Sequence, residues 1–318
     1  MYIHYRNLVL FGLATLLVLF LSAPLDLPLG IYAKENPIDF LVGFFNLSIF
    51  LDNVLGLADI VVFFVLGALA LYIASFFSWG ARFKSIRDYC GYIFSTSFAM
   101  AISLIHAVKW ALSRTRPYDV FPDHLQTFTH WFVPGAYTLD VGFNKGSFPS
   151  GHVATMSVLI ALFFLMPTAR KWNLFRWSYI VIVVAMAMLM GWYRMMYGSH
   201  WFTDNLASLM LSIMLSYFFY HFIFFPSPET RQRYPLFDRM EHRHPAWAIH
   251  LVWQLLVWGF SIATVFVGLR IIFLQDKLLH GTAILLLGIV LSYFFGRVTW
   301  RALFGPVKTA QVEPITSL

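Results

Sequence analysis

The chain contains a single cysteine among 318 residues, Cys90, and this cysteine lies in an apolar run. An intramolecular disulfide is therefore excluded, and no thiol chemistry is indicated. Charged residues are also scarce, at 12% of the sequence, whereas an ordinary soluble domain has roughly 25%. Acidic residues are the rarer sign, with 15 Asp and Glu against 22 Lys and Arg. No basic run carries the interleaved motif residues of a nucleic-acid site, so we expect no nucleic-acid partner.

Hydrophobic residues take the place of the missing charges. They make up 59% of the sequence, and the mean hydropathy is +0.71. The 11 Trp, 15 Tyr and 34 Phe suit the aromatic belts at the two interfaces of a membrane. The formal net charge of +7 suits contact with anionic membrane lipids. The composition therefore predicts an integral membrane protein and leaves its oligomeric state open.

Apolar runs long enough to cross a membrane recur along the chain, since about 20 helical residues span the hydrocarbon core. We predict an all-α polytopic membrane protein with about eight transmembrane helices. The expected organisation is a six-helix core bundle with the site over residues 1–225, a cytoplasmic connection over 226–245, two additional helices over 246–297 and a cytoplasmic tail over 298–318. The runs are about Leu8–Ala23, Ala58–Phe77, Tyr89–Leu112, His152–Met166, Trp177–Tyr193, Trp201–Phe225, Ala246–Phe273 and Leu279–Phe295.

The connections between these runs differ in basic residues, which indicates an orientation. Cytoplasmic connections carry an excess of Lys and Arg, and one set of ends holds 14 of the 22. We therefore expect cytoplasmic termini and, in a bacterial host, an inner-membrane protein with its motifs on the periplasmic face. The first run could instead be a signal peptide, because it ends in Leu21-Ser22-Ala23; we favour a retained anchor, which this topology needs. The long outer connection 24–57 is interpreted as a segment that lies in the membrane interface or re-enters the membrane. The connection 118–147 is interpreted as a cap beside the site. The alternative for both is a plain loop.

A polar stretch interrupts the apolar sequence at Arg194-Met-Met-Tyr-Gly-Ser-His200-Trp-Phe-Thr-Asp204. If the following helix includes His200, then His200 and Asp204 lie four residues apart on one face, and the carboxylate can hold the imidazole in one tautomer. This geometry is typical of a nucleophile and the group that orients it. Taken alone, the stretch is better explained as an interfacial anchor.

A second stretch, residues 109–117, reads KWALSRTRP at the outer end of the third run. Lys109 and Arg116 are about two helical turns apart, so both can face one side, and Pro117 marks the expected helix boundary. A lone basic residue here would more simply snorkel to lipid headgroups.

A third stretch, residues 148–152, reads FPSGH just before the fourth run. A helix N-terminus presents free backbone N–H groups, Ser150 can cap it or donate to an oxyanion, and Gly151 lets a ligand approach the backbone. Read alone, the stretch is an ordinary turn leading into a helix.

Together the three stretches resemble the three-part motif of the type 2 phosphatidic acid phosphatase (PAP2) superfamily. Lys109 stands six residues before Arg116-Pro117, Pro149-Ser150-Gly151-His152 follows, and Arg194 stands five residues before His200, which is three before Asp204. Order and internal spacing match over about residues 89–225. The usual Ser before the third-motif Arg is Tyr193 here, which puts in doubt a secondary hydrogen bond.

The resemblance implies a metal-independent phosphatase with a phosphohistidine intermediate and no cofactor. It implies that His200 attacks phosphorus, that Asp204 orients His200, and that His152 protonates the leaving oxygen and then activates water. The residues agree with this interpretation, because the motif stretches hold four cations, Lys109, Arg114, Arg116 and Arg194, against one carboxylate. That balance suits an anion, whereas a divalent metal would want several carboxylates or neutral imidazoles. The expected phosphate-binding residues are Lys109, Arg116, Ser150, Gly151 and Arg194.

The substrate is less defined than the chemistry. We expect a lipid phosphate or diphosphate, with lipid A phosphate, undecaprenyl diphosphate, phosphatidylglycerophosphate and phosphatidic acid as candidates; the aromatic outer loops and added helices favour a bulky lipid. The reaction needs His200 neutral and His152 protonated. We therefore expect the plot of activity against pH to be bell-shaped. One alternative is a phosphotransferase that passes the phosphoryl group to another lipid. The other is a transporter of an anionic lipid, although its charges should lie in mid-helix rather than at helix ends.

Overall fold

The computed structural model describes residues 2–45, 57–121, 127–135, 146–227 and 246–304, and within these ranges the chain is helical and has no strand. Six helical stretches are long and apolar enough to cross a membrane, and two further apolar stretches are shorter. The prediction of an all-α polytopic membrane protein is therefore confirmed. The six are His4–Glu35, Ser78–Val120, Arg170–Met196, Phe202–Phe224, Trp247–Gln275 and Leu278–Arg301, and the shorter two are Val61–Ala74 and Gly151–Leu165.

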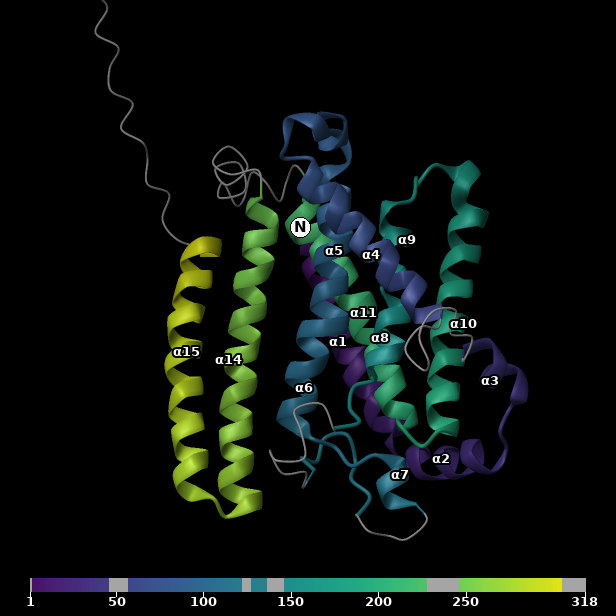
Figure 1. The fold of residues 1–318 in the computed structure, drawn as a ribbon, viewed down its shortest axis with the longest axis vertical. Helices are drawn as coiled ribbons and strands as arrows, with labels where there is room; N and C mark the ends of the chain where they lie inside the picture. The colour runs from purple at the N-terminus through teal and green to yellow at the C-terminus, as the bar shows by residue number, and fades with distance from the viewer. Residues whose placement is uncertain (1, 46–56, 122–126, 136–145, 228–245, 305–318) are drawn as a thin grey trace, which may run out of the picture.

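The helices form a bundle with a separate hairpin at one side (Figure 1). Helix α11 is central, since it packs against α1, α8 and α10, while the α14–α15 hairpin packs through α14 against α6. The helices are α1 (Tyr2–Ser22), α2 (Asp26–Glu35), α3 (Asp39–Phe45), α4 (Leu57–Ala74), α5 (Arg87–Ser97), α6 (Ile105–Leu112), α7 (Pro117–Val120), α8 (Gly151–Ser157), α9 (Ile160–Leu165), α10 (Asn173–Met196), α11 (Phe202–Phe218), α14 (Trp247–Gln275) and α15 (Leu278–Phe304).

Short helical turns and two π-helical segments are the other helical parts of the described residues. The π-helical segments continue α5 into α6 and extend α11, and such segments occur frequently at functional sites. They are Phe98–Leu104 and Phe219–Phe224, and the 3₁₀ turns are Ala23–Leu25, Ser78–Ile86 and Arg170–Trp172.

One end of the bundle, which we call the motif end, gathers the three motif stretches. In Figure 1, α2, α3 and α7 lie at this end beside the last turns of α6 and α10 and the first turns of α8 and α11. The basic turn Ser78–Ile86 lies at the opposite end. The sequence places the motifs together at one end because each begins or ends an apolar run.

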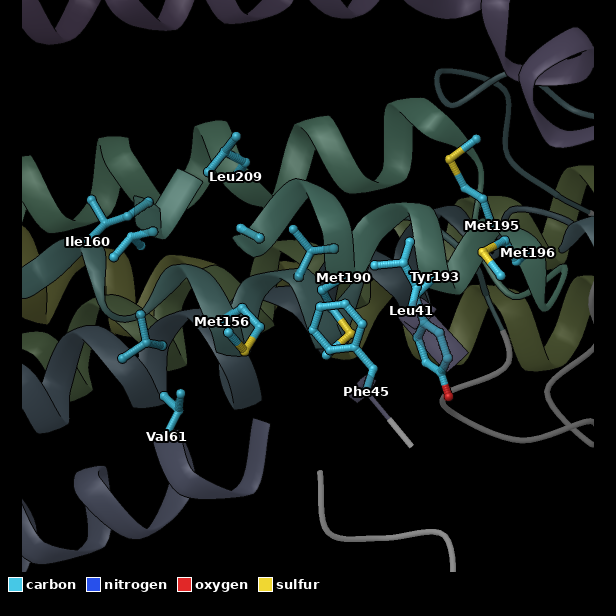
Figure 2. Packing of buried hydrophobic residues seen from close by; sticks show 14 of the residues in the cluster. Leu41, Phe45, Val61, Met156, Ile160, Met190, Tyr193, Met195, Met196 and Leu209 are labelled. Atoms are coloured by element: carbon cyan, nitrogen blue, oxygen red, sulfur yellow. The ribbon is translucent and has the colours of Figure 1, made fainter. Parts of the chain in front are cut away.

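Part of the first outer connection is helical. Residues 26–35 and 39–45 form α2 and α3, while residues 46–56 lie outside the described ranges. Helix α3 is held to α10 by apolar packing: Figure 2 shows Leu41 and Phe45 beside Met190 and Tyr193, and the rings of Phe45 and Tyr193 have centroids 5.5 Å apart. Tyr193, which replaces the usual serine of the third motif, is thus a buried packing residue.

Three helix boundaries at the motif end differ from expectation. Helix α6 ends at Leu112 rather than at Pro117, α8 begins one residue early at Gly151, and α11 begins at Phe202, after His200. Helix α15 continues to Phe304, beyond the expected limit at residue 297. The connection 228–245 and the tail 305–318 lie outside the described residues.

Candidate active site

The first motif is split between the end of α6 and an extended segment. Ser113 takes a left-handed conformation with φ 47° and donates its backbone N–H to the carbonyl of Lys109 at 2.7 Å, which ends the helix. Lys109 is buried in the last helical turn, whereas Arg116 is extended and Pro117 opens α7. The expectation that Lys109 and Arg116 share one face of a helix is therefore wrong.

The second motif presents an unsatisfied hydroxyl. Ser150, just before α8, is completely buried, and its Oγ has no hydrogen-bond partner among the described residues. Its backbone is bonded on both sides, because Ser150 N donates to the Asp204 carbonyl at 3.1 Å and Ser208 Oγ donates to the Ser150 carbonyl at 2.8 Å. A buried hydroxyl without a partner is costly, so Ser150 Oγ is available for a ligand.

Gly151 and His152 follow Ser150 as the first two residues of α8. A Cβ at Gly151 would meet only Ile105 Cγ2, at 3.9 Å, so the surrounding protein does not itself demand a glycine there. His152 is exposed. An exposed imidazole at this position can exchange protons with water and with a bound ligand, as general acid and base chemistry requires.

The third motif turns between α10 and α11. Gly198, with φ +64°, takes the left-handed conformation that glycine adopts without strain. The Gly198 carbonyl accepts a hydrogen bond from Tyr118 N at 2.8 Å, which ties the third motif to the first. Arg194 donates from Nη2 to Ser199 Oγ at 3.0 Å.

His200 is buried, with 2% of its surface exposed, and its Nδ1 lies 2.7 Å from the Ser147 carbonyl oxygen. A carbonyl can only accept, so Nδ1 carries the proton and Nε2 keeps its lone pair. Asp204 Oδ2 is 3.6 Å from Nδ1, too far for a hydrogen bond but close enough for electrostatic attraction. The backbone of Ser147, rather than the side chain of Asp204, therefore makes the direct contact that selects the tautomer.

Burial and the nearby positive charges both lower the pKa of His200. Its pKa lies well below the usual value, first because it is buried and then because of the positive charges of Lys109, Arg116 and Arg194. These three cations come from the first and third motifs. Their common effect on one imidazole agrees with the hydrogen bond between Tyr118 and Gly198, which joins the first and third motifs.

Arg114 has a different role from the other motif cations. It is completely buried, and its Nη1 bonds to Asp204 Oδ1 at 2.5 Å while its Nη2 bonds to Asp26 Oδ2 at 2.7 Å. Its Nε donates to the Thr129 carbonyl at 2.8 Å. Counting Arg114 among the cations that suit an anion is therefore wrong, because two carboxylates engage it. Lys109, Arg116 and Arg194 remain.

The sequence interpretation did not include Asp26 or Ser147. Asp26 is an acidic residue at the end of a long apolar run, which is a signal for a buried partner. Ser147 acts on His200 through its backbone, so no side-chain pattern could identify it. Among the described residues, no group of three or more His, Cys, Asp or Glu is placed to hold a metal ion. The side chains here are mainly cations and hydroxyls, which suit a phosphate.

Comparison with known proteins gives one family. Residues 88–227 match the family model of the PAP2 superfamily. No curated protein and no solved structure matches the chain significantly. The matched segment contains Lys109, Arg116, Ser150, His152, Arg194, His200 and Asp204. All three motif stretches lie inside residues 88–227, the segment that matches the PAP2 superfamily.

Proposed function

We propose that this protein is a membrane lipid phosphatase that hydrolyses a phosphate monoester or diphosphate through a phosphohistidine intermediate. The match of residues 88–227 to the PAP2 superfamily supports a phosphatase-type activity. The observation that carries the proposal is the setting of His200: it is buried, its Nδ1 lies 2.7 Å from the Ser147 carbonyl oxygen, and burial together with the charges of Lys109, Arg116 and Arg194 lowers its pKa. A neutral imidazole among fixed cations is a nucleophile placed where a phosphate would bind.

The proposed reaction has two steps. His200 Nε2 attacks phosphorus, the bond from phosphorus to the lipid oxygen breaks, and His152 gives that oxygen a proton. His152 then takes a proton from water, the oxygen of this water attacks phosphorus, and the bond from phosphorus to Nε2 breaks to release phosphate. Lys109, Arg116 and Arg194, with Ser150 Oγ and the Gly151 N–H, would stabilise the charge on the phosphoryl oxygens.

A lipid substrate is supported by the position of the site at the end of apolar helices. Hydrocarbon tails can remain in the membrane while the headgroup reaches the motif end. Lipid A phosphate, undecaprenyl diphosphate, phosphatidylglycerophosphate and phosphatidic acid remain the candidates, and the added α14–α15 hairpin favours a bulky lipid. We place the site on the external face, periplasmic in a bacterial inner membrane, with cytoplasmic termini, because the sequence connections assigned to the cytoplasmic side contain most of the Lys and Arg.

A phosphate-release panel tests the proposal. Purified protein is incubated with each candidate lipid and no added acceptor, beside the His200→Ala variant. We expect phosphate from at least one lipid with the native protein and none above background with the variant. Release only in the presence of a second lipid would indicate a phosphotransferase instead. Lipid flux in liposomes without phosphate release would indicate a transporter.

A further inference from the structure

Asp26, which lies outside the family-matched segment, forms hydrogen bonds with residues of the first and third motifs. Its side chain is completely buried at the start of α2. Oδ1 accepts a hydrogen bond from the backbone N–H of Thr203 at 2.8 Å, and Oδ2 accepts from Thr203 Oγ1 and from Arg114 Nη2, each at 2.7 Å. One carboxylate therefore joins the N-terminal helices to the turn that begins α11.

Arg114 connects Asp26 to Asp204. Its two terminal nitrogens bond to the two carboxylates, and its Nη1 also donates to Thr203 Oγ1 at 2.9 Å. Asp204 Oδ2 in turn accepts from the backbone N–H of Trp201 at 2.8 Å. Every oxygen of both carboxylates thus has a partner, which fixes the carboxylate of Asp204 beside the His200 ring.

The ionised trio of Asp26, Arg114 and Asp204 has two negative charges and one positive charge. All three side chains are completely buried, so water screens their charges little. The nearest oxygen of the trio to His200, Asp204 Oδ2, is 3.6 Å from Nδ1. The net negative charge therefore lies on the side of the ring that faces away from the attacking Nε2.

The packing of α2 holds Asp26 in this position. Gly30, one helical turn after Asp26, lies against the Trp201 ring: a Cβ there would be 3.0 Å from Trp201 Cζ3. The Trp201 ring is itself fixed, since Nε1 donates to the Thr115 carbonyl at 2.7 Å. Helix α2 is thus fitted to the residue that follows His200, and Asp26 cannot shift without disturbing that contact.

We propose that Asp26 is a positioning residue for the phosphatase reaction, acting through Arg114 on Asp204 and His200. The inference rests on the proposed function. When neutral His200 forms the bond from Nε2 to phosphorus, the ring keeps its Nδ1 proton and becomes positively charged. The net negative trio stabilises that charge, and Asp26 supplies the second carboxylate that makes the trio negative rather than neutral.

The test uses the full-length protein, a lipid that the native protein hydrolyses, and the Asp26→Asn variant. We expect kcat to fall about 10- to 100-fold, by analogy with the loss of groups that orient metal-ligating residues in enzymes. KM and the inhibition constant of inorganic phosphate should stay near their native values, because Asp26 touches neither. Asp39→Asn is the matched control, since Asp39 is exposed at the start of α3 at the same end of the bundle, and it should keep native kcat.

A double variant tests whether Asp26 acts through Arg114. Residues that act through one another show effects that do not add, so Asp26→Asn combined with Arg114→Gln should lose less activity than the product of the two single losses. Losses that multiply would overturn the inference. Native kcat in Asp26→Asn would also overturn it, as would lost phosphate inhibition, which would make Asp26 a general structural residue.

Thr203→Val serves if Asp26→Asn does not fold. It keeps the three charges and removes only the hydroxyl that bonds to Asp26 and Arg114. We expect a smaller fall in kcat with unchanged phosphate inhibition, and unchanged kcat would overturn the inference. A native protein that releases no phosphate from any lipid, or a His200→Ala variant that still does, would overturn the proposed function as well, so the two failures are distinguishable.

Discussion

The motif end of the core and the α14–α15 hairpin are held together by different interactions. At the motif end, hydrogen bonds join residues far apart in the chain, as between Asp26 and Thr203 or between His200 and Ser147. In the hairpin, glycines let the helices touch: a Cβ at Gly268 would be 2.5 Å from Leu285 N, and one at Gly288 would be 2.6 Å from Val265 N.

The two regions are therefore fixed in different ways, one by the packing of small residues and the other by buried hydrogen bonds. Close packing of small residues joins membrane helices without polar groups, and it fixes where α14 and α15 lie but no reactive geometry. Buried polar groups are costly unless fully bonded, so the network at the motif end fixes atoms to within hydrogen-bond tolerance. Substitutions at the motif end should therefore change catalytic activity. Substitutions in the hairpin should change only the stability of the protein.

The largest expected effect is that of His200→Ala. Loss of an attacking nucleophile costs on the order of a millionfold in kcat in a well-studied hydrolase, and we expect phosphate release to fall to background with no phosphoenzyme. His152→Ala should still permit slow phosphorylation of His200, because the ring can attack without the acid, and the phosphoenzyme should then persist because water is no longer activated. Quenching the reaction with alkali, using a lipid labelled in its phosphate, measures both the released phosphate and the phosphoenzyme. His250→Ala, an exposed histidine of α14, is the control; native turnover in His200→Ala would contradict the mechanism.

Loss of one phosphate-binding cation comes next. Lys109→Met should lower kcat on the order of a hundredfold, about 3 kcal/mol, because a preorganised positive charge opposite the developing phosphoryl charge is removed. Lys34→Met removes an exposed cation of α2 at the same end and should have little effect. Steady-state kinetics on one lipid compare them. Equal losses in the two variants would show that overall charge, rather than the placed lysine, matters.

In the hairpin, the expected effect is on stability alone. Gly268→Ala places a methyl group against the Leu285 backbone and should destabilise the hairpin by about 1–3 kcal/mol. Gly259→Ala, in the same helix, has nothing within 4 Å of the new Cβ and should be close to neutral. Thermal unfolding in detergent measures the difference. Activity per folded molecule should remain native in both variants. A large fall in kcat with Gly268→Ala would show instead that catalysis depends on the packing of the hairpin.

The membrane helices and the motif residues could be predicted from the sequence, whereas some helix ends and side-chain partners could not. Apolar runs report membrane helices directly, and the spacing of Lys109, Arg116, His200 and Asp204 reports the motif, because both are patterns along the chain. The turn at Ser113 was missed because Pro117 is a stronger sequence signal for a helix end than a serine in a left-handed conformation. The partners of Arg114 were missed because Asp26 comes from a distant segment, and ion pairing across the fold leaves no spacing in the sequence.

The smallest expected effect is a shift in pH dependence, and it connects Lys109 to the ionisation of His200. Burial and the charges of Lys109, Arg116 and Arg194 lower the pKa of His200, so the neutral nucleophile should persist as the pH falls through about 6.5, the ordinary value for histidine. Lys109→Met removes one of these charges and should raise that pKa, which moves the acid limb of kcat/KM to higher pH. Titration of the substrate phosphate is the same for both proteins, so the difference between their profiles belongs to the enzyme. An acid limb at the same pH in both would show that the charge of Lys109 does not help to keep His200 neutral, whereas the predicted upward shift would assign part of the lowering of the His200 pKa to this cation of the first motif.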